Sequence, residues 1–381
     1  MKASTKKTVA IFSAASLLND IGGDMVKPLW PIFITSTLGA PAAFLGLVDG
    51  FGQLLSYLTR FPSGYYSDRW KRKPFVWTGY IFSGVSRVGY ALSATPLGAF
   101  ISHIVDRTGK GMRDAPRDAI LAAHTSKTDR GKAFGTLRSM DNLGATLGPL
   151  LAFLLIPIIG IRLLFAFAAI PSLIGAVLIF FLIKERVKDN VKRIPFLWKE
   201  LTREYRLVFW ISGLFALSWF SVSFLILYAT TKGGFSESQV PLLYLTYTLT
   251  AACVAYPAGK LSDSIGRRIM LMAAYTVFGL TLAGFAVASN SSMFYILFLL
   301  YGVHYGMIEA MQGAYISDLV REEHRASALG LFQGLWGLCL LPASVIAGLL
   351  WDHVAPWAPF VYGATVVTIA VLLFAWKVPE R

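Results

Sequence analysis

The chain has 381 residues, of which 55% are hydrophobic and only 15% charged, and its formal net charge is +14. A water-soluble chain of this length needs about a quarter of its residues charged to cover its surface, so the composition excludes a soluble enzyme, a disordered scaffold and a secreted disulfide module. The two cysteines, Cys253 and Cys339, both lie in apolar runs and provide neither a disulfide framework nor a metal-ligand spacing. The composition predicts an integral membrane protein.

Twelve apolar runs long enough to cross a bilayer follow one another along the chain. A hydrocarbon core about 30 Å thick needs roughly 20 apolar residues in a helix. The predicted spans cover residues 9–37, 41–62, 74–94, 97–122, 132–157, 162–183, 207–230, 238–259, 268–288, 291–318, 327–350 and 355–376. The first resembles a signal peptide but has no clear cleavage site, so we expect an uncleaved helix. Because the joints are short, the prediction is an all-α membrane protein of twelve transmembrane helices.

Basic residues are concentrated in alternate joints between these spans. The longest joint, 184–206, holds eight of them, whereas the intervening joints carry almost none beyond Arg162 and Lys232. The positive-inside rule therefore places both termini and this joint in the cytoplasm, which suggests a multi-pass protein of the cytoplasmic (inner) membrane. Much of the +14 charge is then a topology signal, and with no larger basic face a nucleic-acid partner is not expected.

An internal repeat relates the two halves of the chain. The segment GYYSDRWKRK from Gly64 matches GKLSDSIGRR from Gly259 at an offset of 195 residues (259 − 64), and the same offset relates Gly111-Met112 to Gly306-Met307. This predicts two homologous six-helix bundles, residues 1–183 and 207–381, joined by a cytoplasmic linker over 184–206. Repeats of this kind build alternating-access transporters, whose substrate site lies near the bilayer midplane.

The first of these segments carries a family resemblance. Its Gly-x-x-x-Asp-Arg-x-x-Arg-Lys pattern, read as a loop after the second span, resembles the signature loop of the major facilitator superfamily. Arg107-Thr-Gly-Lys-Gly111-Met-Arg113-Asp-Ala115 resembles that superfamily's fourth-span motif. Gly135, Gly144, Gly148 and Pro149 are similar to its fifth-span antiporter motif, although Ala152-Phe153 stands where a closing glycine pair is expected. The resemblance implies the fold of two six-helix bundles and transport by alternating access.

The signature segments are expected to control gating. Their residues of interest are Gly64, Asp68, Arg69, Arg72, Gly259, Asp263, Arg267 and Arg268. Asp68 could pair with Arg69, Lys71 or Arg72, or cap a neighbouring helix, and so act as a latch that forms in one conformation and breaks in the other. The alternative is a solvated loop charge. The glycines and Pro149 of the antiporter-like helix allow close helix packing and a bend, with ordinary membrane packing as the alternative.

Charged residues within the first-half spans are the candidates for substrate binding and proton coupling. A charge that faced lipid would cost about 2.5–3.5 kcal/mol, so these side chains are expected to face the interior, pair or line water. The candidates are Asp20, Asp24, Asp49, Arg87, Arg107, Arg113 and Asp114. A carboxylate that is desolvated in one conformation and approached by an arginine in the other changes its proton affinity, as coupling requires. Arg117, Asp118 and Arg138, near the cytoplasmic end, favour packing or gating pairs.

The second half carries little charge within its spans. Glu309, which occupies the repeat position of Asp114, is an acid inside a span and a further candidate. His304 is expected to be a core histidine, and no third ligand that would make a metal site stands near it. The aromatic side chains of this half could line a cavity, although most are expected to pack or face lipid: Trp210, Trp219, Phe220, Tyr228, Tyr244, Tyr247 and Trp336.

Three classes of function follow from these features. The first is a secondary transporter, an antiporter that drives efflux of a small organic solute or drug in exchange for protons. The second is a symporter or uniporter of the same fold that takes up an anionic or metal-chelate solute, which the arginines of the third and fourth spans favour. The absence of a G-x-x-x-x-G-K-[ST] pattern argues against transport driven directly by ATP. The third class, a membrane enzyme or sensor, is disfavoured because no H-E-x-x-H or G-x-S-x-G pattern occurs and because the joint over 184–206 is too short for a cytoplasmic sensor domain. We expect a monomer in the lipid bilayer, without a metal or cofactor.

Overall fold

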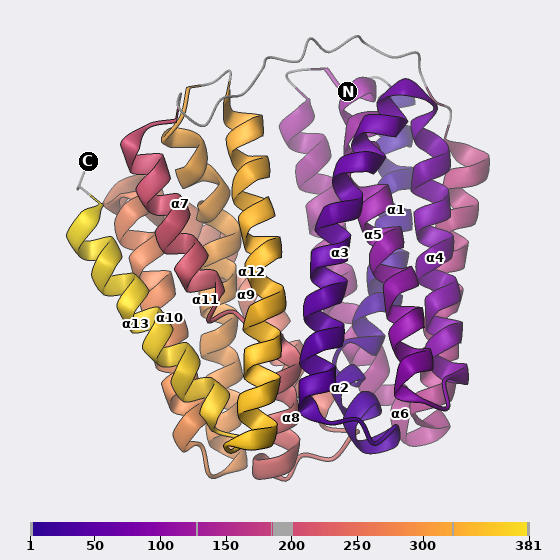
Figure 1. Ribbon diagram of the computed structural model, residues 1–381. Helices are drawn as coiled ribbons and strands as arrows, with labels where there is room; N and C mark the ends of the chain where they lie inside the picture. The colour runs from indigo at the N-terminus through magenta and orange to yellow at the C-terminus, as the bar shows by residue number, and fades with distance from the viewer. Residues whose placement is uncertain (1–2, 127–128, 184, 186–200, 322–323, 379–381) are drawn as a thin grey trace. The chain divides into compact units, whose positions relative to one another are not determined.

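The computed structural model describes residues 3–126, 129–183, 185, 201–321 and 324–378, without the side chains of Ala3, Ser4, Phe61, Asp68 and Ala326. Every regular element in this part of the chain is helical (Figure 1). The elements are α1 (Ala3–Val26), α2 (Trp30–Ile32), η1 (Phe33–Thr37), α3 (Ala42–Arg69), α4 (Arg72–Leu92), α5 (Pro96–His124), α6 (Arg130–Leu182), α7 (Arg203–Ala216), α8 (Val222–Gly233), α9 (Val240–Ile265), α10 (Arg267–Val287), α11 (Ser291–Asp318), α12 (Arg325–His353) and α13 (Ala358–Lys377).

These helices correspond to the twelve predicted spans. The first span consists of α1, α2 and the π-helical segment η1, and the seventh consists of α7 and α8, which are interrupted between Ala216 and Val222. The fifth and sixth spans form one 53-residue element, α6, which is broken at Gly160 (φ 70°, ψ 170°). A residue with a side chain rarely adopts this backbone conformation, so glycine is what permits the break. The predicted all-α fold is confirmed.

Seven of the described helices are long and apolar enough to cross a membrane by length and composition alone. They are α1 from Thr5, α6, α9, α10, α11, α12 from Ser327, and α13. The helices α7 and α8 fall short because each supplies only part of a span. The helices α3, α4 and α5 are long enough, but they contain the charged residues that the sequence places within the first half. Those charges therefore need partners inside the protein.

Polar side chains complete the ends of several helices. Thr95 accepts a hydrogen bond from the backbone N–H of Gly98 at the start of α5, and Asn290 accepts one from Met293 at the start of α11. At the start of α3, the carboxylate of Asp352 accepts the N–H groups of Ala42 and Ala43 at 3.1 and 2.7 Å. A carboxylate at this position satisfies free amide groups and complements the helix dipole.

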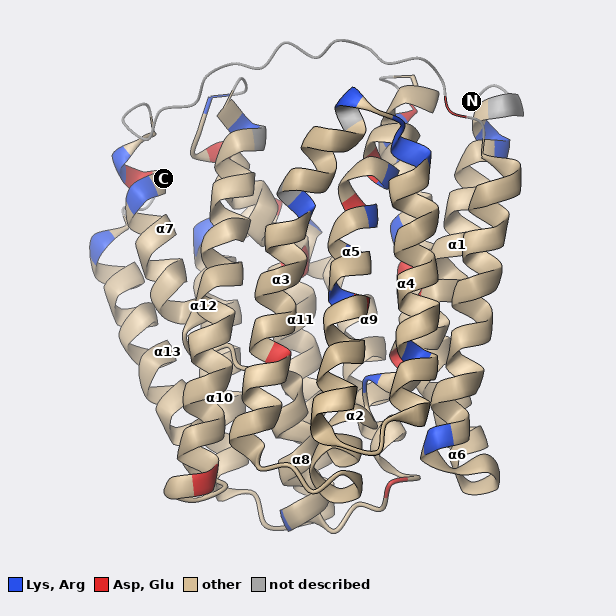
Figure 2. Cartoon of the chain, turned by 45° about the vertical axis from the view of Figure 1, so that its right-hand side comes forward, with Lys and Arg blue, Asp and Glu red and all other residues tan. Residues whose placement is uncertain are grey.

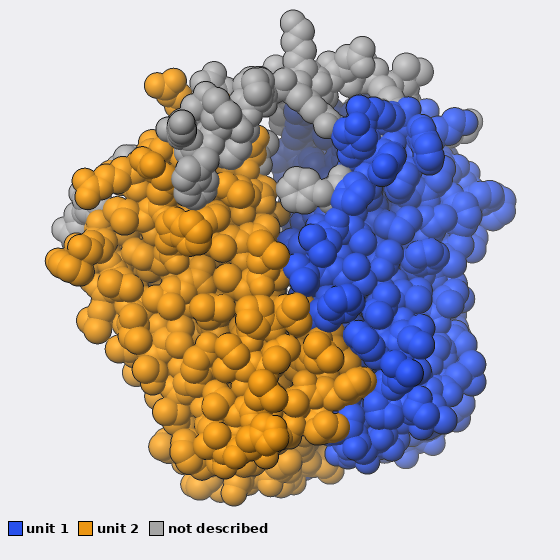
Figure 3. Space-filling view, in the orientation of Figure 1, with its two compact units in different colours: residues 1–40, 51–191, 237–242 blue, residues 41–50, 192–236, 243–381 orange. Residues whose placement is uncertain are grey.

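The chain divides into two compact units, which Figure 3 distinguishes by colour. Unit 1 comprises Met1–Ala40, Phe51–Val191 and Glu237–Leu242, and unit 2 comprises Pro41–Gly50, Lys192–Ser236 and Leu243–Arg381. The predicted domain boundaries, 1–183 and 207–381, remain a prediction. Most of the predicted linker, 184–206, lies outside the described residues.

Equivalent contacts recur in the two units at the offset of the sequence repeat. A Cβ atom added to Gly64 would lie 3.7 Å from the Cβ of Ala115, and one added to Gly259 would lie 3.8 Å from the Cβ of Ala310. Likewise, an atom added to Gly111 would meet the carbonyl oxygen of Ser56, and one added to Gly306 would meet that of Ala251. Each pair differs by 195 residues (259 − 64; 310 − 115; 306 − 111; 251 − 56), so the repeat extends to the packing of individual helices.

The signature segments are helical, which corrects their prediction as loops. Residues from Gly64 to Arg69 form the last turns of α3, and residues from Gly259 to Ile265 form the last turns of α9. The chain leaves the helix only over Trp70 and Lys71 in the first case and at Gly266, with φ 94°, in the second. The backbone of α3 and α9 stays helical through the charged residues that follow each apolar run. Because hydropathy detects only the apolar run, it places the end of each helix too early.

Candidate functional site

Charged residues occur within α3, α4 and α5 as well as at their ends, whereas α10 and α13 carry theirs near the helix ends (Figure 2). Within unit 1, α4 and α5 contact α1 and α6, and α1 and α6 pack closely against each other. No group of three or more His, Cys, Asp or Glu residues that could hold a metal ion occurs among the described residues. The charged interior of unit 1 is the candidate functional site.

The side chain of Asn19, in α1, joins the polar groups at the centre of this site. Its Oδ1 atom accepts hydrogen bonds from Ser172 Oγ at 2.8 Å and Arg113 Nη1 at 3.4 Å, and it lies 3.5 Å from Arg87 Nη2. Its Nδ2 group donates to Asp20 Oδ1 at 3.1 Å. One buried amide therefore separates a carboxylate from two guanidinium groups and contacts all of them.

Arg87, in α4, is held entirely by uncharged oxygen atoms. Its Nη1 group donates to the carbonyl oxygen of Ala168 at 2.9 Å and to Ser172 Oγ, and its Nη2 group donates to the carbonyl oxygen of Asn19 at 3.0 Å. The residue is 3% exposed. Among the described residues no carboxylate contacts it, and Asp106 and Asp20 act on it only at longer range. The guanidinium thus links α4 to α1 and α6.

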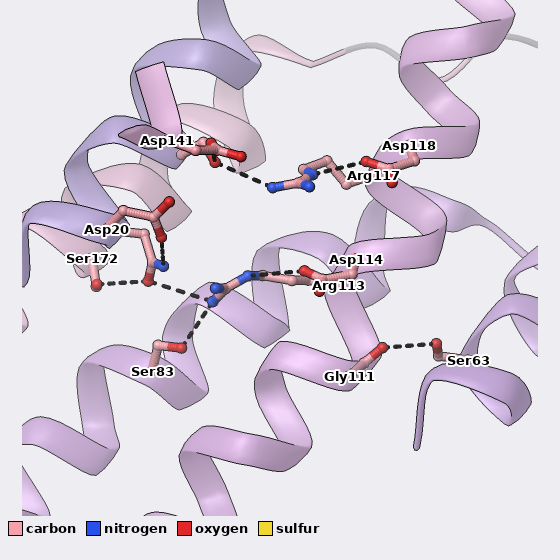
Figure 4. A network of polar contacts seen from close by, with 12 residues as sticks. Asp20, Ser63, Ser83, Gly111, Arg113, Asp114, Arg117, Asp118, Asp141 and Ser172 are labelled. Atoms are coloured by element: carbon pink, nitrogen blue, oxygen red, sulfur yellow. Dashed lines mark hydrogen bonds and ion pairs between the residues drawn. The ribbon is translucent and has the colours of Figure 1, made fainter. Parts of the chain in front are cut away.

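The guanidinium group of Arg113, in α5, contacts both the side-chain amide of Asn19 and the hydroxyl group of Ser83 in α4. Its Nη1 group also donates to Ser83 Oγ at 2.9 Å, its Nε atom lies 3.7 Å from Asp114 Oδ1, and its guanidinium lies 4.8 Å from the ring centre of Tyr80. Figure 4 shows the contacts of Arg113 with Ser83 and Asp114 in one network that continues to Ser172 and Asp20. Arginine's planar group suits this position, because it can donate in several directions at once.

Asp20 forms no salt bridge within the described part of the chain. Its recorded hydrogen bond comes from the neutral Asn19 amide. The charges that act on it from neighbouring positions are those of Asp24 and Lys27 on α1, Arg113 on α5 and Asp141 on α6. Protonation of such a carboxylate breaks no salt bridge, whereas protonation of an ion-paired carboxylate removes the attraction to its partner.

A second polar chain lies beside the first. Arg117 donates through Nε to Asp118 Oδ1 at 3.1 Å and through Nη1 to Ser16 Oγ at 3.2 Å, and Ser16 donates to Asp141 Oδ1 at 2.5 Å (Figure 4). Arg138 lies 3.6 Å from the other oxygen of Asp141, with 64% of its side chain exposed. Both carboxylates in this second group contact an arginine. Asp118 contacts Arg117, and Asp141 contacts Arg138 and is connected to Arg117 through Ser16. The arrangement favours the predicted role in packing or gating.

The structure brings Asp20, Arg87, Arg113 and Asp114 together and places the remaining candidates elsewhere. Asp24, 2% exposed, pairs with Lys27 at 2.7 Å. Arg107 lies 3.7 Å from Asp106 and donates to His103 Nε2 at 3.2 Å. Asp49 belongs to unit 2, where it accepts a 2.6 Å hydrogen bond from Ser221 at the interruption between α7 and α8, and Glu309 is an exposed residue of α11.

The antiporter-like glycines bring α6 against the acidic residues of α1. A Cβ atom added to Gly144 would lie 2.9 Å from the Cβ of Asp20, and one added to Gly148 would lie 2.9 Å from the Cβ of Asp24 and 2.6 Å from the carbonyl oxygen of Ile21. An atom added to Gly135 would meet nothing within 4 Å. Glycine is therefore required for close packing at Gly144 and Gly148, and not at Gly135.

The described signature residues contact different partners in the two units. In unit 2, Arg267 lies 3.4 Å from Asp263 and 3.0 Å from Asp318, which joins α9, α10 and α11. In unit 1, Arg69 lies over the ring of Tyr65 at 3.5 Å. The backbone N–H groups of Arg72 and Lys73, at the start of α4, donate to Glu185. The side chain of Asp68 lies outside the described residues, so its role as a latch remains a prediction.

Arg268, the remaining signature arginine, donates to the carbonyl oxygen of Ala375 in α13 at 3.1 Å. Pro149 is a buried residue inside α6, next to Gly148. The structure therefore positions these two residues within helix packing, and their predicted gating or antiport roles are not tested by it.

Sequence reasoning missed the neutral residues that connect the charged ones. Asn19, Ser83 and Ser172 are all buried, at 3%, 1% and 0% exposure. A signal for Asn19 exists, because an amide next to Asp20 in an apolar span needs interior partners. Ser83 and Ser172 carry no such signal, since a serine in a membrane helix can bond to its own backbone.

The Arg87 contacts lead to a prediction on stability. Arg87→Lys should lower the free energy of unfolding by about 1–3 kcal/mol, because one ammonium group cannot replace the guanidinium contacts to α1 and α6. Arg138→Lys, on an exposed side chain, should change it by less than about 0.5 kcal/mol. Thermal unfolding of the purified variants measures both. Equal melting temperatures for the two variants would contradict the role of Arg87 in joining the helices.

Comparison with known proteins places this architecture in a family. The sequence model of the Major Facilitator Superfamily matches residues 12–232 and 208–381. The chain belongs to the major facilitator superfamily. An MFS-type transporter of Methanocaldococcus jannaschii is 37% identical over 377 residues, which cover 96% of this chain and 94% of that protein. The multidrug resistance protein MdtH of Aeromonas hydrophila is 24% identical, with 94% and 92% covered.

Solved structures share the fold of this superfamily member. A mutant of the nucleoside transporter NupG superposes with a TM-score of 0.84 at 14% identity, covering 97% of this chain and 99% of that one. A D-xylose-proton symporter superposes with a TM-score of 0.76 at 15% identity, with 98% of each chain covered. The two six-helix bundles predicted from the sequence are those of the superfamily. The protein is a multi-pass membrane transporter of small molecules, and not an enzyme.

Proposed function

We propose that this transporter is a proton-coupled antiporter that exports a small organic solute, with Asp20 as the group that carries the proton. The observation that carries the proposal is the position of Asp20, which forms no salt bridge among the described residues yet lies one amide away from Arg87 and Arg113. The name of the MdtH relative, a multidrug resistance protein, favours export.

The Asn19 amide provides a mechanism for coupling. With Asp20 protonated, the amide can hold the carboxyl group and the two arginines apart. After the proton leaves, the negative charge attracts the arginines, and a small rotation of Asn19 would let a direct pair form. The charges on every neighbouring helix take part in this balance: Asp24 and Lys27 on α1, Arg87 on α4, Arg113 on α5 and Asp141 on α6. A conformational change that moves α1 relative to α5 would thereby release or bind a proton.

The remaining candidates keep supporting roles in this proposal. Five of them would adjust the electrostatic potential at the proton site or contact the solute: Asp24, Asp49, Arg107, Asp114 and Glu309. The signature and antiporter-like residues would control the exchange between conformations. From the distribution of basic residues, we propose that both termini lie in the cytoplasm and that the protein resides in the inner membrane. A monomer is the default expectation for this fold.

Flux measurements in proteoliposomes test the direction of coupling. A thermal-shift screen of drug, sugar, organic-acid and metal-chelate libraries at two pH values first identifies a solute. A pH gradient is then imposed across the membrane, with a matched preparation lacking the gradient. Exchange for protons predicts accumulation of the solute on the more acidic side. Accumulation on the more alkaline side would refute the antiport proposal.

Proton-coupled uptake of an anionic solute is the second candidate. The observation that favours it is Arg87, a buried guanidinium bound only by uncharged oxygen atoms among the described residues. A carboxylate or phosphate group is the natural partner for such a guanidinium. Under this alternative the solutes identified by the screen would be anions, and they would accumulate on the more alkaline side.

A further inference from the structure

The interior of unit 2 contains a dense group of rings, the His304 cluster, formed by Phe215, Trp219, Phe278, His304 and Trp336. His304 stacks on Phe278 with ring centres 4.5 Å apart and lies 4.8 Å from Trp219. Trp336 lies 4.9 Å from Trp219 and 5.9 Å from Phe215. His304 is fully buried and Trp336 is 8% exposed. Trp219 thus contacts both the imidazole ring of His304 and the indole ring of Trp336.

Two ring nitrogens in this cluster lack hydrogen-bond partners in the described part of the chain. His304 Nδ1 lies 2.7 Å from the carbonyl oxygen of Ala274, and because a carbonyl only accepts, Nδ1 carries the hydrogen atom. In neutral histidine Nε2 is then an acceptor, and it is buried without a donor. Trp336 Nε1 is a donor that is buried without an acceptor. Such atoms are uncommon in proteins, and each calls for an explanation, such as a functional role or an ordered water or ion.

The repeat places part of the His304 cluster where unit 1 carries residues of the charged site. At the offset of 195 residues, Phe278 corresponds to Ser83, His304 to Gly109 and Trp336 to Asp141. The backbone contact is kept as well. Gly109 packs against the carbonyl of Gly79, and His304 bonds to the carbonyl of Ala274, the equivalent residue (274 − 79 = 195). Unit 1 therefore carries polar and charged residues where unit 2 carries aromatic rings, and two of these rings have a nitrogen without a hydrogen-bond partner among the described residues, His304 Nε2 and Trp336 Nε1.

We propose that the His304 cluster binds the planar aromatic part of the transported solute. An N–H or O–H group of the solute would donate to His304 Nε2, an acceptor atom of the solute would receive the Trp336 Nε1 hydrogen, and the ring would lie against Trp219. The chemical class is a flat heteroaromatic or aromatic-amide compound that carries both a donor and an acceptor. This proposal rests on the proposed transport function and names the solute that it would carry.

Trp336→Phe separates a binding role from a packing role. Phenylalanine keeps an aromatic ring and removes the N–H group that has no partner in the described structure. If the cluster only packs, the variant should be neutral or slightly stabilising, since an unsatisfied buried donor disappears. If it binds the solute, affinity should fall about tenfold while the melting temperature of the ligand-free protein stays the same.

Equilibrium binding to the full chain in lipid nanodiscs supplies the measurement. The probes are adenine, uracil and nicotinamide, with cyclohexanecarboxamide as a saturated amide, and Trp376→Phe, at a 74% exposed position of α13, serves as the matched control. The expected result is that at least one planar probe binds, that the saturated amide does not, and that Trp336→Phe alone weakens binding. The proposal is overturned if no planar probe binds or if Trp336→Phe binds as the parent does.

The experiments distinguish an error in the proposed binding site from an error in the proposed proton antiport. The binding measurement uses no gradient and leaves Asp20 intact, so it is independent of coupling. Binding that depends on Trp336 without proton-driven flux would support the site and contradict the antiport proposal. Proton-driven flux of a solute whose binding is unchanged by Trp336→Phe would support the antiport proposal and contradict the site.

Discussion

Asp20→Asn is expected to reduce pH-driven accumulation of the solute to less than about a tenth of the parent value, because an amide neither binds nor releases a proton. Binding of the solute should remain measurable, as should exchange of labelled for unlabelled solute across the membrane, since neither process moves a proton. The three measurements, on the same proteoliposomes and nanodiscs, separate loss of coupling from loss of binding.

Asp129→Asn is the matched control for Asp20→Asn. Asp129 lies in the connection before α6, outside the spans, and the hydrogen bond from Ser126 at 3.0 Å lowers the pKa of its carboxyl group. It therefore stays ionised at neutral pH and cannot carry the transported proton. The control should transport as the parent does. If Asp20→Asn still accumulates solute against a gradient at the parent rate, Asp20 is not the coupling group.

Gly148→Ala should lower the free energy of unfolding by about 1–3 kcal/mol. The added methyl group would meet the carbonyl oxygen of Ile21 and the Cβ of Asp24, both on α1, and backbone atoms cannot move aside as a flexible side chain can. The helices α1 and α6 must then separate, which displaces the acidic residues of the candidate site. We therefore expect reduced transport together with a lower melting temperature.

Gly135→Ala tests the same substitution in the same helix where no neighbour lies within 4 Å. There alanine should stabilise the protein by up to about 1 kcal/mol, through its higher helix propensity. The two substitutions should therefore act in opposite directions. A loss of stability of equal size in both would mean that the cost arises from the helix itself and not from its contact with α1.

The positions of the membrane spans could be predicted from the sequence because each is an apolar run with short connections. The repeat and the family could be predicted because Asp263 and its neighbours copy the pattern around Asp68 at a constant offset. The helix ends were predicted less well. The residues after Gly64 and Gly259 are charged or polar, and hydropathy alone cannot reveal that their backbone continues as a helix.

The candidate site was predicted only in part, because charge marks a residue as interior without naming its partner. Arg113 and Asp114 were expected and do lie together. Asp49 was grouped with the first-half charges, but it contacts Ser221 in unit 2, and this pairing depends on tertiary structure that no local pattern encodes. Asn19 was missed because a neutral amide gives a weak signal, although its four polar contacts organise the site.

The offset that relates Phe278 to Ser83 and Trp336 to Asp141 also has a use in protein engineering. Counterpart positions share packing contacts at Gly64 and Gly259 and at Gly111 and Gly306, so the residue that one half carries is a candidate substitution at the counterpart position of the other half. A combinatorial library that exchanges residues between counterpart positions would sample variants already close to foldable. The packing of an aromatic ring depends on shape, whereas a buried charge is stable only when all of its polar partners are present. We therefore expect single exchanges to be tolerated more often in the aromatic half than in the charged half.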